Sequence, residues 1–535
     1  MSNEASITDI SEENWKPSRN PWYSAGAVML TIFMVVLDSS IANVALPHIA
    51  GTFSATRDES TWVLTSYLVA NGVIIPSTAW FSTLIGRKNF LLLSTLMFTL
   101  ASAMCGFATS MTMLIFARVI QGIGGGAIMP IAQAVMMEEF PPEERGVAMS
   151  VFGFGVIFAP IIGPTLGGWI TDTYSWHWIF LINVPFGIIS LWLIKKFIED
   201  PPYARKGKVK TVDYWGFILL IIWLFVLQII LDNGQKSDWF GASWVRWSAT
   251  VVAITFVAFI IRELVVKEPI VDLKVFKDKN FSIGTVLHFV IGAVLYSTLA
   301  ILPLFLQQLM GYTATLSGLA ISPRGFGSLT GLVICAILAN RVDQRWVIAA
   351  GMLILAFSNI LFGTLNLQIS MGNIILPNVI CGVAFSMVMI PLMTISFVTL
   401  KNNQMTNATG VFNLAKSVGG AIGTSAVSTM VSRMSQVHQT HLIRNLTYSN
   451  PGFVEKLNAM QSGIAALSGH ALSAAKANVM VYKQLVQQST LMAYMDCFKI
   501  YAAMLVLLTP LIFLFQKVKY KKQKSAKVEA PLPSK

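Results

Sequence analysis

The chain has 535 residues, of which 55% are hydrophobic and only 12% are charged. This balance lies outside the range of soluble globular domains, so a lipid bilayer is the expected solvent. Apolar runs of about 20 residues recur along the sequence, each long enough to cross a hydrocarbon core of roughly 30 Å as a helix.

Hydropathy predicts about fourteen transmembrane helices, because continuous apolar runs lack the alternating polarity of barrel strands. In chain order they cover residues 22–46, 61–82, 89–108, 112–136, 146–170, 178–198, 214–232, 245–262, 282–306, 316–338, 346–366, 373–398, 408–430 and 497–516. An even number of spans places both termini on the same side of the membrane. The first twenty residues contain no apolar stretch, so we expect no cleavable signal and the first span directs insertion.

Basic residues concentrate in the connections on one side of the membrane. These connections and the C-terminal tail contain Arg87, Lys88, Arg145, Lys195, Lys196, Arg205, Lys206, Lys208, Lys210, Lys267, Lys274, Lys277, Lys279, Arg341, Arg345, Lys517, Lys519, Lys521, Lys522, Lys524 and Lys527. The other side holds little beyond Arg57, Lys236 and Arg246. Loops rich in lysine and arginine stay cytoplasmic, so both termini are predicted to be cytoplasmic. The net charge of +13 is then explained mainly by this topology, and the basic loops can also contact anionic membrane lipids. Nucleic acid is therefore not an expected partner.

The connection from about residue 431 to 490 is far longer than the other external loops. Within it, apolar residues recur at helical spacing, namely Phe453, Leu457, Met460, Ile464 and Leu467, and later Val481, Leu485 and Val486. This pattern predicts an external helical hairpin. The alternative is a solvated linker with residual helix.

No pattern of enzyme chemistry is found. The four cysteines, Cys105, Cys335, Cys381 and Cys497, lie in or beside apolar segments without metal-ligand spacing, so neither a disulfide nor a metal site is predicted. The glycine run Gly122 to Gly126 lies inside an apolar helix rather than at a strand-to-helix turn, which argues against nucleotide binding. We therefore predict no catalytic residue, no cofactor and no enzymatic activity.

A set of motifs in fixed order resembles the fourteen-span drug:proton antiporter family (EmrB/QacA type) of the major facilitator superfamily. The matching segments are Leu37 to Pro47, Trp62, Tyr67, Gly86 to Lys88, Arg118 to Gly126, Gly155 to Gly168, Trp176 to Phe180, Asn183 to Pro185, Leu302 to Gln307, Gly311 with Tyr312, and Gly410 to Gly423. They cover nearly the whole chain, and together they are more specific than any one motif.

The resemblance implies an all-α polytopic protein with the major facilitator fold. Two six-helix bundles, residues 1–198 and 281–516, would flank a segment of two additional helices at 199–280, and a basic cytoplasmic tail would follow at 517–535. Each bundle would contain inverted three-helix repeats, and rocking of the bundles would give alternating access. The motif Gly86, Arg87 and Lys88 would belong to a cytoplasmic gate. Thr83 and Leu84 stand where the family usually has an acid and a base, which puts a charge-based latch in doubt.

Asp38 and Arg118 are ionisable residues placed deep within predicted spans. Asp38 lies about sixteen residues, or ~24 Å, from the cytoplasmic start of its span, and Arg118 about six residues, or ~9 Å, from the external start of its own. In a core of roughly 30 Å their depths nearly coincide. A carboxylate that pairs with Arg118, or is protonated when that pairing weakens, can couple proton movement to conformation. The alternative is a static ion pair that holds two spans together.

The fifth span resembles the antiporter motif of the superfamily in Gly155, Pro160, Gly163, Pro164 and Gly167. The two prolines remove amide donors and are expected to bend the helix. Glycines four residues apart, as in the pairs Gly122 with Gly126, Gly163 with Gly167 and Gly419 with Gly423, allow close helix approach.

A substrate cavity between the bundles needs apolar and aromatic walls with few polar points. The candidates are Phe33, Asn43, Trp62, Tyr67, Gln121, Tyr296, Phe305, Gln307 and Phe412, although each one alone is more readily explained by packing. His288, Arg324, Lys416 and Asp496 also occur in apolar segments; we interpret His288 as structural, Arg324 and Lys416 as snorkelling or lining a cavity, and Asp496 as lying at the membrane surface.

The combined prediction is a proton-driven multidrug exporter of the bacterial inner membrane that expels small amphipathic or lipophilic compounds. Asp38 makes lipophilic cations plausible substrates, without excluding neutral or acidic compounds. As in some family members with a similar loop, a periplasmic adaptor (membrane fusion protein) would dock on the hairpin and pass substrate to an outer-membrane channel. The alternatives are an exporter of one metabolite or siderophore, a proton-coupled importer, and a membrane sensor or scaffold.

Overall fold

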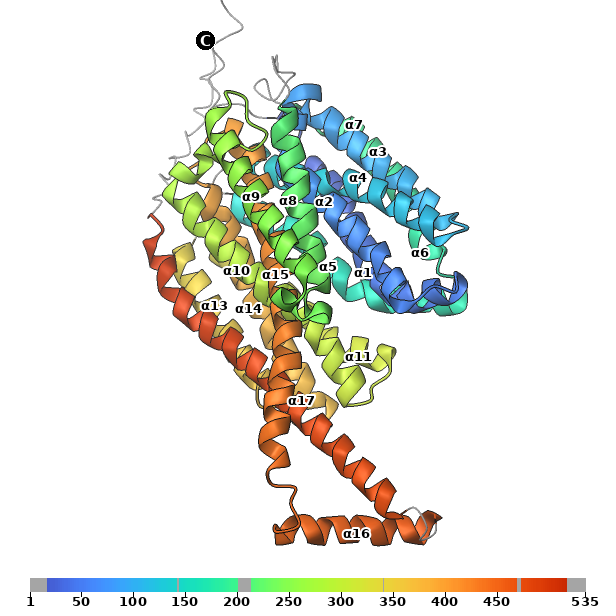
Figure 1. The fold of residues 1–535 in the computed structure, drawn as a ribbon. Coiled ribbons are helices and arrows are strands. Elements are labelled where there is room, and N and C mark those ends of the chain that lie inside the picture. The colour runs from blue at the N-terminus through green and yellow to red at the C-terminus, as the bar shows by residue number, and fades with distance from the viewer. Residues whose placement is uncertain (1–16, 142–143, 201–212, 340, 469–472, 517–535) are drawn as a thin grey trace, which may run out of the picture.

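The computed structural model describes residues 17–141, 144–200, 213–339, 341–468 and 473–516, and these form helices joined by short connections (Figure 1). The α-helices are α1 Pro21–Thr52, α2 Arg57–Ile85, α3 Arg87–Gly106, α4 Met111–Glu139, α5 Arg145–Thr173, α6 Trp178–Leu181, α7 Asn183–Phe197, α8 Tyr214–Asn233, α9 Ser243–Val265, α10 Lys279–Leu304, α11 Ala314–Ile321, α12 Pro323–Leu338, α13 Gln344–Phe362, α14 Met371–Phe397, α15 Met405–Ile443, α16 Pro451–Ser468 and α17 Ser473–Leu508. A π-helical turn, Phe305–Leu309, extends α10, and a 3₁₀ turn, Thr509–Leu514, follows α17.

Polar residues fix where several helices begin. Thr56 and Glu59 form a reciprocal capping box at the start of α2, and the side chains of Ser110 and Asp278 accept hydrogen bonds from backbone amides in the first turns of α4 and α10. Such caps satisfy amides that have no partner inside the helix. The apolar runs therefore start as helices at positions that the local sequence defines.

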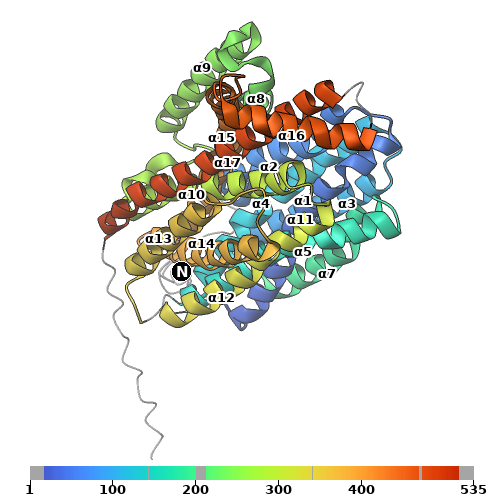
Figure 2. The same ribbon diagram turned by 90° about the horizontal axis from the view of Figure 1, so that it is seen from below.

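The helices form two bundles with a separate pair beside them. In the N-terminal bundle α1 packs on α5 and α2 on α4, and in the C-terminal bundle α10 packs on α15 and α12 on α14. Seen from below, the two bundles lie side by side, with α8 and α9 at one edge of the molecule (Figure 2). α8 contacts both α2 and α15, so it bridges the two bundles. This arrangement confirms the predicted all-helical major facilitator architecture.

The predicted spans correspond to helices of the structure throughout. Among the described residues, twelve helices are long and apolar enough to cross a bilayer, and α5 raises this to thirteen when its bent halves are counted as one span. The remaining predicted span, 408–430, lies within α15, a helix that packs between α10 and α17. The 41° bend in α5 separates Arg145–Pro160 from Thr165–Thr173, where the two prolines predicted it.

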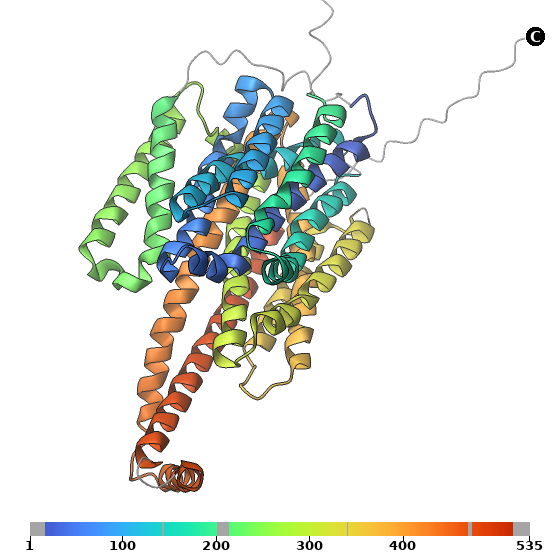
Figure 3. The same cartoon turned by 90° about the vertical axis from the view of Figure 1, so that its right-hand side faces the viewer.

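The long external connection is helical, but its geometry differs from that of a separate hairpin. α15 and α17 continue beyond the rest of the molecule, and α16 lies across their tips (Figures 1 and 3). Leu457 of α16 and Leu485 of α17 are buried, whereas Leu467 lies where side chains are not described. We call this projecting end the hairpin end, and the opposite end, where α1 begins and the 3₁₀ turn after α17 stops, the tail end.

Glycines bring the paired helices into backbone contact. A Cβ atom at Gly122 of α4 would lie 2.5 Å from the carbonyl oxygen of Tyr67 on α2. One at Gly126 would lie 2.7 Å from the carbonyl oxygen of Asn71 on the same helix. A Cβ atom at Gly423 of α15 would lie 2.6 Å from the carbonyl oxygen of Ala293 on α10. A methyl group cannot occupy such positions, so these glycines are required for helix packing, as their spacing predicted.

Gly419→Ala is expected to destabilise the C-terminal bundle, because its Cβ atom would collide with the carbonyl oxygen of Phe289. Overpacking of this kind costs about 1–3 kcal/mol. Gly463→Ala in α16 is the matched control, since no atom lies within 4 Å of the Cβ position there. Thermal unfolding of the purified variants in mild detergent should show a lower midpoint for Gly419→Ala alone. Equal midpoints would contradict the packing role.

Candidate functional site

Asp38 is the centre of a buried polar cluster in the N-terminal bundle. Its carboxylate accepts hydrogen bonds from Arg118 Nη1 at 2.6 Å, from Gln121 Nε2 at 2.8 Å and from Asn183 Nδ2 at 2.7 Å. The side chains of Asp38 and Arg118 are both 0% exposed. The nearly equal depths that the sequence predicted for these two residues therefore correspond to a direct ion pair.

The guanidinium group of Arg118 is enclosed by groups from several helices. Its Nε atom donates to the carbonyl oxygen of Val63 at 3.0 Å, and its Nη1 atom also donates to Gln121 Oε1 at 2.7 Å. The guanidinium carbon lies 4.2 Å from the ring centroid of Tyr67 and 5.6 Å from that of Phe180. Aromatic faces add electrostatic stabilisation of a buried cation. The cluster thus holds a charged pair without exposing it to water.

Two members of this cluster carried no predicted role. Ser102 of α3 accepts hydrogen bonds from Gln121 and Asn183 and donates to the carbonyl oxygen of Phe180. Both side chains are neutral, whereas Asp38 and Arg118 stood out because they are ionisable. Asn183 begins the family-like segment Asn183 to Pro185, and its amide within an apolar run was the signal that pointed to it.

The predicted cavity residues do not form one group. Tyr67 and Gln121 belong to the Asp38 cluster, while Phe305 and Phe412 are packed inside the C-terminal bundle, 1% and 0% exposed. Phe33 is half-buried, whereas Asn43, Trp62, Tyr296 and Gln307 are exposed. All partners of Asp38 named above come from its own bundle, so in this state its charge is directed to Arg118 rather than to a substrate cation.

The antiporter-like motif of α5 faces α1. Cβ atoms at Gly155 and Gly167 would lie 3.1 Å and 2.9 Å from side-chain atoms of Met29 and Ile41, and Gly163 abuts Ser40. Ser40 Oγ donates to the carbonyl oxygen of Pro160 at 3.4 Å. The motif therefore joins the bent α5 to the helix that carries Asp38. The side chain of Pro164 is not among those described.

The predicted gate motif begins with Gly86, whose φ of +89° suits a residue without a Cβ atom. Arg87 Nη1 lies 2.5 Å from Glu138 Oε2 of α4, and both side chains are buried. The backbone amide of Lys88 donates to Asp200 Oδ1 at 2.8 Å, and its ammonium group donates to the carbonyl oxygen of Lys195 at 2.8 Å. Acids from other segments thus pair with the motif, although Thr83 and Leu84 occupy the usual positions of the loop charges.

The bundles are in contact toward the tail end. Thr409 Oγ1 of α15 donates to the carbonyl oxygen of Pro130 on α4 at 2.9 Å, and Asn413 Nδ2 donates to Gln133 Oε1 at 2.7 Å. On the other side of the molecule a Cβ atom at Gly146 of α5 would lie 2.7 Å from the Cβ atom of Ala339.

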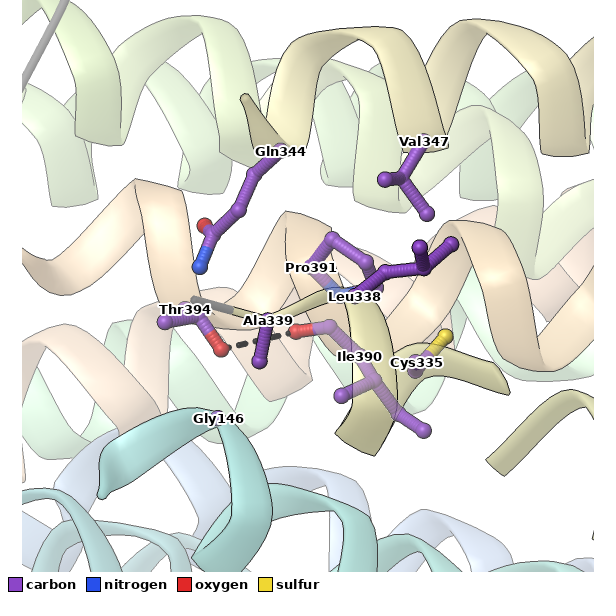
Figure 4. A pocket seen from close by; sticks show the side chains of 9 residues that line it. All are labelled: Gly146, Cys335, Leu338, Ala339, Gln344, Val347, Ile390, Pro391 and Thr394. Atoms are coloured by element: carbon purple, nitrogen blue, oxygen red, sulfur yellow. Dashed lines mark hydrogen bonds between the residues drawn. The ribbon is translucent and has the colours of Figure 1, made fainter. Parts of the chain in front are cut away.

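A small cavity lies beside this second contact. Figure 4 shows it between α5 and the helices α12 to α14, lined by Gly146, Cys335, Leu338, Ala339, Gln344, Val347, Ile390, Pro391 and Thr394. Its volume of about 10 Å³ holds no more than one water molecule. The helices of the two bundles are therefore tightly packed at this contact.

Arg118→Met is expected to lower the free energy of unfolding by about 3–5 kcal/mol, because it leaves the Asp38 carboxylate buried without its cation. The double variant Asp38→Asn with Arg118→Met removes both charges and should recover much of that loss. Equilibrium unfolding of four proteins in mixed micelles, namely the wild type, Arg118→Met, Asp38→Asn and the double variant, measures the coupling between the two sites. Additive effects of the two substitutions would show that the pair contributes no coupling energy.

Comparison with known proteins agrees with this architecture. The Major Facilitator Superfamily pattern matches residues 28–424. The probable multidrug resistance protein EmrY of Escherichia coli K12 is 35% identical over 503 residues, covering 92% of this chain and 94% of that protein. The multidrug export protein EmrB of the same organism is 34% identical, with 91% and 94% covered, and the fatty acid resistance protein FarB of Neisseria gonorrhoeae is 33% identical, with the same coverage.

Solved structures share the fold at low sequence identity. A proton:xylose symporter, XylE, superposes with a TM-score of 0.59 at 14% identity, covering 92% of this chain and 95% of that one. The human organic anion transporter MFSD10 gives a TM-score of 0.60 at 14% identity, covering 93% of this chain and 100% of that one. The chain belongs to the major facilitator superfamily, in its EmrB/QacA-type family of multi-pass membrane transporters.

Proposed function

We propose that this protein is a proton-driven exporter of amphipathic compounds that works by alternating access in a bacterial inner membrane. The names of its relatives, multidrug export and fatty acid resistance proteins, support export of such compounds. The observation that supports proton coupling is the ion pair of Asp38 and Arg118. The ionised carboxylate neutralises the buried cation, whereas the protonated carboxyl leaves it without a counter-charge, so the two protonation states differ strongly in energy.

In the proposed cycle, a proton from the external side binds to Asp38 and removes the charge that Arg118 neutralises. The uncompensated guanidinium group then favours a different arrangement of α1, α4 and α7, the helices that supply Asp38, Arg118 and Asn183. This change accompanies substrate release and resetting. Loss of the proton toward the cytoplasm restores the pair and accompanies binding of the next substrate.

The positive-inside rule makes the tail end cytoplasmic, because the basic connections lie there. The contacts of α15 with α4 and of α5 with α12 would then close the cytoplasmic side of the transporter in this state. Opening this side requires α4 and α15 to separate. The proposed cycle therefore alternates between these contacts and contacts at the opposite end.

The hairpin end would lie in the periplasm and provide the docking site for a periplasmic adaptor. α15 and α17 project from the bundles (Figure 3). Apolar side chains are exposed on this projection, namely Val437, Ile443, Tyr448, Val479, Met480 and Tyr482. Exposed apolar groups beyond the lipid favour contact with a protein partner. The adaptor would pass substrate to an outer-membrane channel.

Asp38→Asn is expected to abolish proton-coupled efflux, because an amide cannot bind and release the proton. Substrate-induced proton release from inverted vesicles, read with a ΔpH probe, measures this activity. Asp172→Asn is the matched control, since the Asp172 side chain is 72% exposed and its carboxylate lies 3.8 Å from His48 Nε2. Normal coupled efflux by a folded Asp38→Asn variant would exclude the proposed role.

Deletion of residues 440–485 is expected to spare proton coupling in inverted vesicles and to remove drug resistance in cells. The deleted segment contains α16 and the tips of its two neighbouring helices, while the Asp38 cluster is left intact. Vesicle assays and minimal inhibitory concentrations should be measured on the same variant. Equal loss in both assays would indicate a folding role for the hairpin instead of adaptor docking.

A further inference from the structure

Buried charge is distributed unevenly between the two bundles. Among the described residues, the buried carboxylates are those of Asp38, Glu138, Glu139, Asp213 and Glu263, all of which precede α10. From α10 onward the buried ionisable side chains that carry or can gain a positive charge are His288, Arg324 and Lys416, and no aspartate or glutamate described there is buried. The interior of the C-terminal bundle is therefore cationic without an internal counter-charge.

Lys416 is a member of this set that reaches the other bundle. Its side chain, 5% exposed, extends from α15, and its ammonium group lies 3.6 Å from the sulfur of Met129 on α4. A thioether is a weak acceptor and does not neutralise a charge. No carboxylate of the described residues lies within ion-pair distance of this ammonium group, in contrast to Arg118, which has Asp38. An ammonium group held in this way is stabilised by any anion that reaches it.

His288 lies on α10, one helical turn nearer the tail end than Gly292, which contacts Lys416. Its ring stacks on Phe412 with centroids 3.8 Å apart, and neither ring nitrogen has a hydrogen-bond partner among the described residues. One turn further along α10, a Cβ atom at Gly292 would lie 2.5 Å from the carbonyl oxygen of Lys416. His288 and Lys416 therefore lie at adjacent turns of the α10–α15 contact. Both side chains carry polar groups whose hydrogen-bonding capacity is not fully used.

One turn further along α10 lies a side chain that is not fully buried. Tyr296 of α10 abuts Gly420 of α15 and is 40% exposed. Lys416 thus lies between the buried ring of Phe412 and an accessible aromatic side chain, at the contact between α4 and α15. Separation of these two helices, which alternating access requires, would expose its ammonium group to the space between the bundles.

We propose that Lys416 binds the negatively charged headgroup of the transported compound, with His288 as a neighbouring polar group, so that the substrates are amphipathic anions such as carboxylates and sulfonates. The apolar part of the substrate would lie against the aromatic and aliphatic side chains between the bundles. This proposal rests on the proposed export function and defines its substrate class. In the closed state described here, Met129 takes the place of the headgroup.

Transport of two probes with the same alkyl chain and opposite charge tests this assignment: an alkyl sulfonate and an alkyltrimethylammonium. Wild-type inverted vesicles should take up the sulfonate, and Lys416→Met should reduce this uptake on the order of tenfold or more, the effect of losing one charged hydrogen bond. Lys416→Arg should retain it, and uptake of the ammonium probe should not fall. Lys499→Met is the matched control, because Lys499 is exposed on α17.

Binding separates failure of this proposal from failure of the export function. The sulfonate should raise the unfolding midpoint of purified wild-type protein, and Lys416→Met, with Lys416→Gln as a second variant, should lose that shift. If wild type transports neither probe but keeps a Lys416-dependent shift, the site stands and the export function fails. Unchanged sulfonate uptake and binding in Lys416→Met would overturn the proposal. Equal loss of both probes in a folded variant would also overturn it, since it would assign Lys416 to bundle movement instead.

Discussion

A charge inside an apolar bundle must have a partner, and this constraint organises the N-terminal half of the protein. Asp38 and Arg118 neutralise each other at 2.6 Å, and Gln121 and Asn183 donate two further hydrogen bonds to the carboxylate. Because these groups come from α1, α4 and α7, the pair also fixes how three helices are arranged around it. The same interaction that stabilises the bundle is the one that a proton at Asp38 would disrupt, which joins stability to the proposed transport cycle.

The C-terminal half meets the same constraint differently. Lys416, Arg324 and His288 are buried, but none of the aspartates and glutamates described from α10 onward is buried, so the compensation that the N-terminal bundle contains internally is missing. A charge that is compensated within the protein suits a coupling site, whereas an uncompensated one suits a ligand of opposite sign. In the proposed mechanism the two bundles would divide coupling and substrate recognition, and the contact of Lys416 with Met129 would place recognition at the interface that has to open.

Glycine makes both arrangements possible. α4 approaches α2 through Gly122 and Gly126, which brings Tyr67 over the guanidinium group of Arg118. α15 approaches α10 through Gly419 and Gly423, which fixes the levels at which His288 and Lys416 lie. Without a hydrophobic driving force between helices in lipid, such close backbone contact supplies much of the packing energy. The small residues therefore set the geometry in which the charged ones act.

The sequence by itself determined the helical class, the positions of the apolar helices and the helical character of the connection at about 431–490. It also determined that Asp38 and Arg118 lie at nearly equal depths in their helices. These properties depend on local hydropathy and on distance along a helix, which a linear sequence records directly. The tertiary structure decided which side chains meet: it brought Asn183 and Ser102 to Asp38, placed Phe305 and Phe412 in the packed interior instead of near Trp62, and directed Lys416 to α4. Successive residues of a helix point about 100° apart, so these encounters depend on helix rotation and on bundle contacts that no local pattern specifies.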